Sequence, residues 1–252
     1  MALDYELRGK TGIVTGAASG IGKAAALLMA HMGARLCLVD RDEKRLHEAI
    51  SEIGIGGDAE SLICDVAEAS QVNRMVADAM RSLESLDFLV NSAGILRRTA
   101  FPEIDPAEWD LMMGVNLRGA FLCCRAAVPH MLKCGRGVIV NVASLAGRSC
   151  SILGGAHYTT AKHGLVGLSR HLARELGPRG IRVNAFCPGA TLTPMTLETT
   201  TESERKRVAG SVPLGRWGLP EEQARVIAFL VSDAAVFITG ACIDSNGGSL
   251  MV

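Results

Sequence analysis

The sequence has no excess charge of either sign and few aromatic side chains. Among its 252 residues, 26 Lys and Arg balance 26 Asp and Glu, and aromatic residues make up 4%. This balance argues against nucleic acid or an anionic membrane as the main partner, because proteins that bind either usually carry excess basic charge. We therefore expect a small-molecule substrate and neither of those partners.

The sequence also lacks a long apolar run and a basic, apolar leader at its start. Its longest strictly apolar stretch, residues 24–30, is far shorter than the roughly 20 residues that span a bilayer. The eight cysteines include no C-x-x-C pair, and the histidines show no grouping with metal-ligand spacing. Most of the cysteines lie within apolar runs, where a free thiol behaves as a small core residue. These absences predict a cytoplasmic protein with no metal site.

What the sequence does contain is a regular alternation of short apolar runs with longer segments of helical periodicity. The predicted strands are residues 11–15, 35–39, 61–64, 87–91, 137–142, 181–186 and 241–244. The predicted helices are residues 22–32, 42–53, 70–83, 106–133, 158–176 and 220–232. Several strands lack polar alternation, which is typical of parallel strands covered on both faces. The pattern predicts one α/β domain over residues 1–252, with a doubly wound parallel sheet of about seven strands between helices.

One segment departs from this rhythm. Residues 193–217 are rich in charged side chains and have few large apolar ones. The segment is too long and polar for an ordinary connection, and it follows the end of a predicted strand. We interpret it as a lid over a binding site. A solvated helical excursion is the alternative.

The segment from Thr15 to Gly22 lies between the first predicted strand and the first helix. Its glycines, Gly16, Gly20 and Gly22, permit a tight turn and let backbone N–H groups approach a pyrophosphate at the positive end of a helix dipole. The spacing is G-x-x-x-G-x-G, a weak signal by itself in a chain with 28 glycines. Its place between a strand and a helix predicts a dinucleotide site.

Asp40 ends the second predicted strand, 20 positions after Gly20. A carboxylate there can accept hydrogen bonds from the adenosine ribose and repel a 2′-phosphate, which favours NAD over NADP. Ser19, in place of a basic residue before Gly20, supports the same choice. The neighbouring Arg41 argues against it, because a guanidinium can bind that phosphate. The alternative role for Asp40 is to cap the helix that follows.

Two further strand ends supply small or acidic residues. Asp65, followed by Val66, comes after the third strand and can meet the adenine amino group or cap the next helix. Asn91, Ala93 and Gly94 follow the fourth strand, where small residues let the backbone lie close to a ribose. An ordinary turn would require no such role.

Tyr158 and Lys162 lie four residues apart at the start of a predicted helix, so both project from one face. A nearby ammonium lowers the pKa of a phenol, which would make Tyr158 a proton acceptor or donor. The motif Y-x-x-x-K is weak alone, and an ordinary surface pair is the alternative. Ser144 follows the fifth strand, where its hydroxyl can hold a substrate oxygen. Asn116 lies inside a helix, where an amide is mildly unfavourable unless it has a function such as a water bridge to Lys162.

Together these motifs resemble the short-chain dehydrogenase/reductase family, whose fold is Rossmann-like. The resemblance covers essentially the whole chain and extends to Pro188-Gly189 and residues 213–222. One departure is visible, because the family's Asn-Asn-Ala-Gly stands here as Asn91-Ser92-Ala93-Gly94. The small, polar Ser92 is not expected to disturb cofactor binding.

The resemblance implies a role for each matching residue. Asn116, Ser144, Tyr158 and Lys162 would form the catalytic tetrad, with Tyr158 as general acid/base. Lys162 would also hold the nicotinamide ribose, and Asn116 would anchor a relay water. The residues implied to bind the dinucleotide are Gly16, Ser19, Gly20, Ile21, Gly22, Asp40, Asp65, Val66, Asn91, Ala93, Gly94, Tyr158, Lys162, Pro188, Gly189 and Thr193. The resemblance further implies a homotetramer, or a homodimer, packed through the helices at 106–133 and 158–176.

The substrate is less defined than the reaction. The residues expected to face it are Leu96, Arg97, Leu145, Cys150, His157, Ala190 and the 193–217 segment. A pair like Arg97-Arg98 also occurs in family members that act on sugar acids, and an arginine can bind a carboxylate through two hydrogen bonds. Surface solvation or an inter-subunit ion pair is the alternative. We interpret the substrate as hydroxylated and polar, such as a sugar acid or polyol.

The sequence thus predicts an NAD-dependent oxidoreductase that interconverts a secondary alcohol and a ketone. An NADPH-dependent reductase of 3-oxoacyl thioesters or other ketones is the alternative within the enzyme class, and Asp40 argues against it. A catalytically silent dinucleotide-binding protein is the alternative outside that class. The paired Tyr158 and Lys162 argue against that alternative.

Overall fold

All the strands of the described chain pair into one parallel sheet. The structure is a computed structural model that describes residues 6–53 and 58–252. Its strands are β1 (Thr11–Thr15), β2 (Arg35–Asp40), β3 (Ala59–Ile63), β4 (Phe88–Asn91), β5 (Gly137–Val142), β6 (Ile181–Pro188) and β7 (Cys242–Ser245). They lie in the order β3-β2-β1-β4-β5-β6-β7, and every neighbouring pair is parallel. The predicted doubly wound, Rossmann-like sheet is confirmed.

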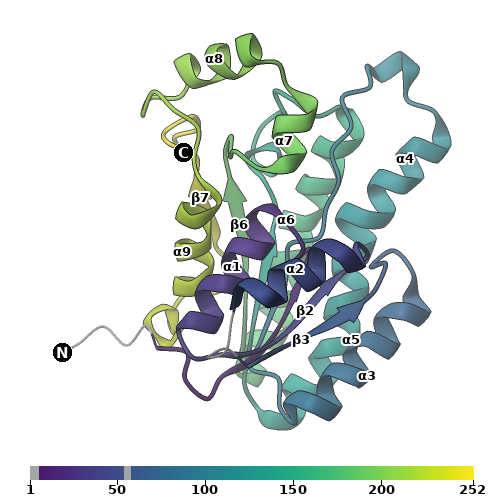
Figure 1. The fold of residues 1–252 in the computed structure, drawn as a ribbon, viewed down its shortest axis with the longest axis vertical. Helices are drawn as coiled ribbons and strands as arrows, with labels where there is room; N and C mark the ends of the chain where they lie inside the picture. The colour runs from purple at the N-terminus through teal and green to yellow at the C-terminus, as the bar shows by residue number, and fades with distance from the viewer. Residues whose placement is uncertain (1–5, 54–57) are drawn as a thin grey trace.

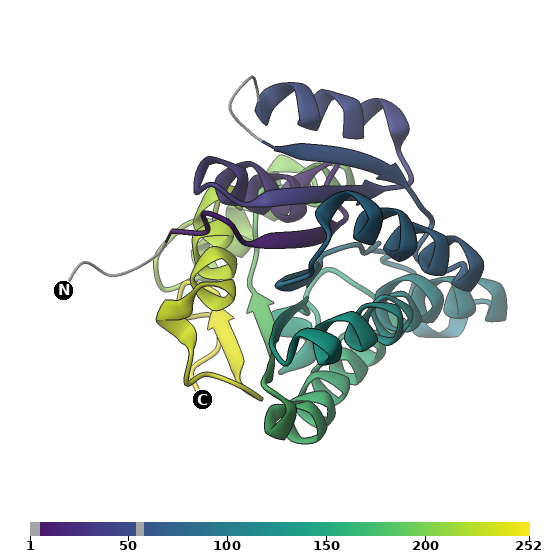
Figure 2. The same ribbon diagram turned by 90° about the horizontal axis from the view of Figure 1, so that it is seen from below.

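Helices cover both faces of this sheet, as Figure 2 shows. They are α1 (Gly20–His31), α2 (Glu43–Ile53), α3 (Ala69–Leu83), α4 (Pro106–Met113), α5 (Gly119–Cys134), α6 (Ala156–Leu176), α7 (Pro194–Thr199), α8 (Glu202–Ser211) and α9 (Pro220–Val231). One apolar cluster joins α1, α2 and α9 to one face, and another joins α3, α5 and α6 to the opposite face. Neighbouring residues of a strand serve different clusters: Val14 packs in the first and Ile13 in the second. The strands therefore read as continuous apolar runs.

The helix predicted at 106–133 is not one uninterrupted α-helix. It consists of α4, a π-helical turn η2 (Gly114–Arg118), and α5. Within η2, the Asn116 amide nitrogen donates to the carbonyl of Met112 at 3.2 Å and to that of Ile95 at 3.1 Å. A π-helical turn changes which way its side chains face, and such turns are frequent at functional sites. The other predicted element ends differ from the observed ones by at most two residues.

The run from Pro106 to Cys134 is long and apolar enough to cross a membrane, with a mean hydropathy of 1.3 in its most apolar window. Half of that window is buried inside the protein, and α5 packs against α3 and the sheet. Its apolar character therefore serves the core.

The sheet order reverses between β1 and β4, which lie side by side although β2 and β3 intervene in the sequence. The two connections leave this point in opposite directions, so a crevice opens at the carboxyl ends of the strands. Figure 1 shows α7 and α8 beyond those ends. The segment predicted as a lid thus lies over the crevice.

Candidate active site

A cavity of about 560 Å³ follows the carboxyl ends of the strands beneath α7 and α8. All but one of the residues predicted to bind the dinucleotide line it. Those that line it are Gly16, Ser19, Gly20, Ile21, Gly22, Asp40, Asp65, Val66, Ala93, Gly94, Tyr158, Lys162, Pro188, Gly189 and Thr193. The exception is Asn91, whose buried side chain donates to Asn141 at 2.8 Å. Its amide thus joins β4 to β5 beneath the cavity.

The turn between β1 and α1 requires its glycines. Gly16 and Gly20 have positive φ angles of 69° and 56°, a conformation that favours glycine. A Cβ at Gly16 would lie 2.7 Å from the backbone of Ala93, and one at Gly22 would lie 2.2 Å from the Gly16 carbonyl oxygen. Ser19 precedes α1 without capping it. The turn therefore presents backbone N–H groups and a hydroxyl to the cavity at the positive end of the helix.

The Asp40 carboxylate is fixed by three backbone N–H groups. Its Oδ2 accepts from Ala18 at 3.1 Å, and its Oδ1 accepts from Arg41 at 2.8 Å and Asp42 at 3.1 Å. Capping of α2 falls instead to Asp42, whose Oδ1 accepts from the N–H of Arg45 at 3.0 Å. Asp40 is therefore not the side-chain cap of α2, and its carboxylate faces the cavity.

Asp65 lies at the same end of the cavity, after β3. Its Oδ1 accepts from the N–H of Ala67 at 2.9 Å, which holds a turn two residues before α3 begins. The residue lines the cavity and does not cap α3, whose N-cap position is Glu68. The strand order places Asp65 and Asp40 together at the β3-β2 edge of the sheet.

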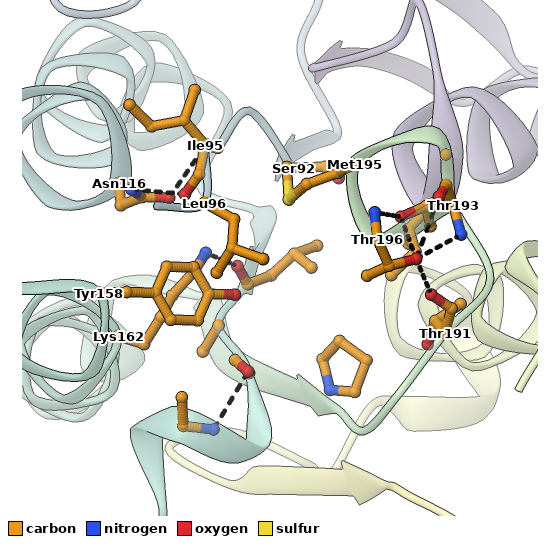
Figure 3. Close-up of a pocket in the computed structure, with 18 of the residues that line it drawn as sticks. Ser92, Ile95, Leu96, Asn116, Tyr158, Lys162, Thr191, Thr193, Met195 and Thr196 are labelled. Atoms are coloured by element: carbon orange, nitrogen blue, oxygen red, sulfur yellow. Dashed lines mark hydrogen bonds between the residues drawn. The ribbon is translucent and has the colours of Figure 1, made fainter. Parts of the chain in front are cut away.

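Tyr158, Lys162 and Ser144 meet at the other end of the cavity. Figure 3 shows the phenol oxygen of Tyr158 pointing into the cavity, with Leu96 beside the ring. The Lys162 Nζ donates to the carbonyl of Val142 at 2.9 Å and lies 5.7 Å from the Tyr158 ring centroid. Ser144 accepts from the N–H of Ala146 at 3.1 Å, which starts the turn η3 (Leu145–Gly147) and fixes its hydroxyl.

Burial has the largest effect on the pKa values of Tyr158 and Lys162. It raises the pKa of Tyr158 above the ordinary value, and the hydrogen bond from Ser144 opposes that rise. Burial likewise lowers the pKa of Lys162 to about 8. From the sequence, we expected Lys162 to lower the pKa of Tyr158. In the structure, the Lys162 ammonium donates instead to the carbonyl of Val142, and desolvation of the phenol has the largest effect on the Tyr158 pKa.

Asn116 lies beneath the loop that follows β4. Its Oδ1 accepts from the N–H of Ile95 at 3.1 Å, while its amide nitrogen donates to the Ile95 carbonyl at the same distance. A Cβ at Gly94 would lie 2.8 Å from that Oδ1 and 3.7 Å from the Lys162 Nζ. The side chain is therefore fully engaged in holding the 94–95 backbone close to Lys162.

His157 does not line the cavity, which corrects one prediction. The side chain is fully buried, its Nδ1 accepts from the N–H of Tyr158 at 2.9 Å, and its Nε2 lies 2.7 Å from Oε1 of Glu108 on α4. Successive helical residues point about 100° apart, so His157 faces α4 when Tyr158 faces the cavity. Sequence reasoning missed Glu108, which no spacing rule connects to the site.

Arg97 also lies outside the cavity, so its predicted place in the substrate pocket is wrong. Its side chain is exposed and donates to the carbonyl of Leu96 at 3.1 Å. Arg98 pairs with Glu204 of α8 at 2.6 Å and donates to the carbonyl of Thr199. Arg98 thus attaches the loop after β4 to the α7–α8 segment.

The remaining predicted pocket residues, Leu145, Cys150 and Ala190, line the cavity, as does Leu96. The structure adds Ile152, Leu153, Met195, Val208 and Val212, which sequence reasoning did not single out. Three of these belong to the 193–217 segment, whose charged residues had drawn attention to it. Met195, Val208 and Val212 of this segment line the cavity.

Comparison with known proteins gives the family. Residues 16–249 match the family model described as enoyl-(acyl carrier protein) reductase. The 3-oxoacyl-(acyl-carrier-protein) reductase of Thermotoga maritima is 39% identical over 243 residues, which are 96% of this chain and 98% of that protein. D-threitol dehydrogenase of Mycolicibacterium smegmatis is 37% identical over 97% of this chain and 94% of its own. A solved 3-ketoacyl-(acyl-carrier-protein) reductase from Brucella melitensis, complexed with NADH, superimposes with a TM-score of 0.91 at 36% identity, covering 97% of this chain and 99% of its own.

The chain belongs to the short-chain dehydrogenase/reductase family. It is an oxidoreductase that acts on CH–OH groups and uses a nicotinamide dinucleotide. The glycine turn and the fixed Asp40 carboxylate fit the phosphate and ribose parts of such a cofactor.

Proposed function

We propose that this protein is an NAD-dependent oxidoreductase that interconverts a secondary alcohol and a ketone. The observation that carries the proposal is the layout of one cavity. The Asp40 carboxylate lies at one end, and the Tyr158 phenol and Ser144 hydroxyl lie at the other. The order of strands separates the two ends, since Asp40 ends β2 and Ser144 follows β5.

The choice of NAD rests on Asp40. Its carboxylate can accept hydrogen bonds from both ribose hydroxyls, and it would repel a 2′-phosphate at the same position. Backbone N–H groups hold it in place, so it cannot turn away from that phosphate without losing them. Arg41 also lines the cavity and is the residue that would assist NADP. A relative complexed with NADH supports the first choice.

Tyr158, Ser144 and Lys162, at the end of the cavity away from Asp40, each have a separate role in the reaction. A bound nicotinamide supplies the hydride for ketone reduction or accepts it in alcohol oxidation. Tyr158 gives its phenolic proton to the substrate oxygen during reduction and takes it back during oxidation. Ser144 orients that oxygen and hydrogen-bonds the phenol. Lys162, buried beside the ring, would hold the nicotinamide ribose, and its ammonium donates to the carbonyl of Val142.

The second candidate is an NADPH-dependent reductase of 3-oxoacyl thioesters or related ketones. The 3-oxoacyl-(acyl-carrier-protein) reductases among the relatives favour it. The proton transfer by Tyr158 would be the same. The two candidates differ in the cofactor and in the substrate, and Asp40 favours the first.

We further propose that the protein acts in the cytoplasm as a homotetramer, or a homodimer, without nucleic acid or membrane partners. All eight cysteines are free, as suits a reducing compartment. Size-exclusion chromatography with light scattering would test the assembly.

The experiment that tests the function follows NADH formation by purified protein with NAD and a panel of secondary alcohols, polyols and sugar acids. NADP and the Tyr158→Phe variant are run in parallel. The proposal is supported if the wild-type protein turns over an alcohol with NAD and the Tyr158→Phe variant does not. A strong preference for NADP and a 3-oxoacyl thioester supports the second candidate. NADH binding without turnover of any alcohol or ketone indicates a silent dinucleotide-binding protein.

A further inference from the structure

The part of the cavity beyond Tyr158 has apolar walls, and we call it the outer pocket. Its walls come from the loop after β4, the segment after β5, and helices α7 and α8. The apolar side chains that line it are Leu96, Leu145, Ile152, Met195, Val208 and Val212. Figure 3 shows Leu96 beside the Tyr158 ring and Met195 on the opposite wall. A substrate held at Tyr158 therefore extends between apolar surfaces.

The charged residues of the cavity lie elsewhere. Asp40, Arg41 and Asp65 follow β2 and β3, at the far side of the sheet from the strands that carry the outer pocket. Lys162 lies at the boundary, and its ammonium donates to the carbonyl of Val142. Among the described residues, none with a formal charge lines the outer pocket.

The basic residues Arg98, in the loop after β4, and Arg205, on α8, do not supply a charge to this pocket. Arg98 bonds to Glu204 and to the carbonyl of Thr199. Arg205 donates to the carbonyl of Thr200 at 2.6 Å. Neither lines the cavity, so a carboxylate in the outer pocket would find no cation there.

Two of the hydroxyl groups that line the cavity, those of Ser211 and Ser249, already donate their protons to the protein. Ser211 donates to the carbonyl of Val208 at 2.7 Å, and Ser249 donates to that of Asn246 at 2.8 Å. Both line the cavity, and both have used their only proton. They can accept a hydrogen bond from a substrate hydroxyl but cannot donate one to a carboxylate.

We propose that the substrate is an uncharged secondary alcohol or ketone with an apolar body, which lies in the outer pocket. The proposal rests on the proposed function and names its substrate class. Burying a carboxylate without a partner is far costlier than burying a methyl group, which sets sugar acids aside. Each methylene removed from water contributes about a 3- to 4-fold gain in affinity. If the substrate has a second, neutral hydroxyl group, Ser211 or Ser249 can accept a hydrogen bond from it.

The test measures binding to the NAD-loaded protein by isothermal titration calorimetry, because NAD has no hydride to give and a ketone therefore binds without reacting. The ligands are 2-butanone, 2-hexanone and 2-octanone, with 7-oxooctanoate as the matched acid of the longest ketone. We expect Kd to fall about 10-fold for each added pair of methylenes. We expect 7-oxooctanoate to bind at least 30-fold more weakly than 2-octanone.

Two variants sharpen the result. Met195→Lys places a cation in the outer pocket and should reduce the preference for 2-octanone over 7-oxooctanoate at least 10-fold. Leu197→Lys is the matched control, because Leu197 is on the same helix but is exposed and lies outside the cavity. It should leave the preference unchanged.

The inference is overturned if 7-oxooctanoate binds as tightly as 2-octanone, if chain length does not change Kd, or if no neutral ketone binds. Turnover is measured separately with NAD and the corresponding alcohols. Turnover with a preference for acids would leave the proposed function intact and overturn the inference. The expected binding pattern without turnover would support the inference and remove the proposed function.

Discussion

The Nε2 atom of the buried His157 lies 2.7 Å from Oε1 of Glu108, whose side chain is partly exposed. The other ring nitrogen of His157 accepts the backbone N–H of Tyr158, so the ring proton lies on Nε2 and is donated to Glu108. A hydrogen bond from Thr99 and this one from His157 lower the pKa of Glu108. The start of α6 is thereby fixed to α4 next to Tyr158, the residue that carries the phenol.

Removing this contact should impair catalysis more than cofactor binding. We expect His157→Ala to lower kcat about 10- to 100-fold, because a small displacement of a reacting group has effects of that size. Kd for NADH should remain within about 2-fold. His171→Ala is the matched control, since His171 is exposed on the same helix and pairs with Glu175. An unchanged kcat for the His157 variant, in a folded protein, would contradict this role.

The cofactor preference should depend on Asp40. Replacing it in Asp40→Ala removes the charge that repels a 2′-phosphate and leaves Arg41 nearby. We expect kcat/KM to fall at least 10-fold with NAD and to rise at least 10-fold with NADP. Asp42→Ala should destabilise the protein by about 1 kcal/mol through loss of the α2 cap, without a change in preference. If Asp40→Ala keeps the wild-type preference between NAD and NADP, as Asp42→Ala should, then Asp40 does not select the cofactor.

The pH dependence should follow Tyr158. Alcohol oxidation requires the phenolate, and burial raises the pKa of Tyr158, so kcat/KM for oxidation should rise through the alkaline range. Ser144→Ala removes the hydrogen bond that lowers this pKa, and the rising limb should therefore move to higher pH. Ketone reduction requires the protonated phenol and should stay level from pH 6 to 8. The profile of the variant is compared with that of the wild type between pH 6 and 10.5; a shift to lower pH would be incompatible with the assignment.

The ion pair between Arg98 and Glu204 should hold α7 and α8 over the cavity. It lowers the pKa of Glu204 to about 2, so the pair stays intact at all pH values used for assays. We expect Arg98→Ala to raise KM several-fold, with a smaller effect on kcat, because the outer pocket depends on the position of α7 and α8. Exposed Arg207 on α8 provides the control, and Arg207→Ala should leave KM unchanged. Equal effects of the two substitutions would show that the pair has no special role.

The sheet and the residues that meet in the cavity could be predicted because they depend on local patterns. Continuous apolar runs mark buried parallel strands, and the glycine turn and Y-x-x-x-K spacing have direct geometric meaning. The strand order then brings Asp40 and Tyr158 to one cavity, although they lie far apart in the sequence.

The features that sequence reasoning missed depend on contacts between distant segments. The π-helical turn at Asn116 arises where its amide bonds to the loop after β4. His157 was expected in the pocket because it neighbours Tyr158, but helical geometry turns it towards Glu108. Arg97 was placed in the pocket from its position after a strand, while the loop directs it to the surface. The partners that these side chains meet cannot be identified from local spacing.

The most direct test of the central claim reduces a ketone with NADH deuterated at the transferred position and analyses the product by mass spectrometry. The account predicts a deuterium on the carbinol carbon of the wild-type product. Tyr158→Phe should lower the rate about 100- to 10,000-fold, while NADH binding persists. A product without deuterium, or an unchanged rate in the variant, would contradict the account.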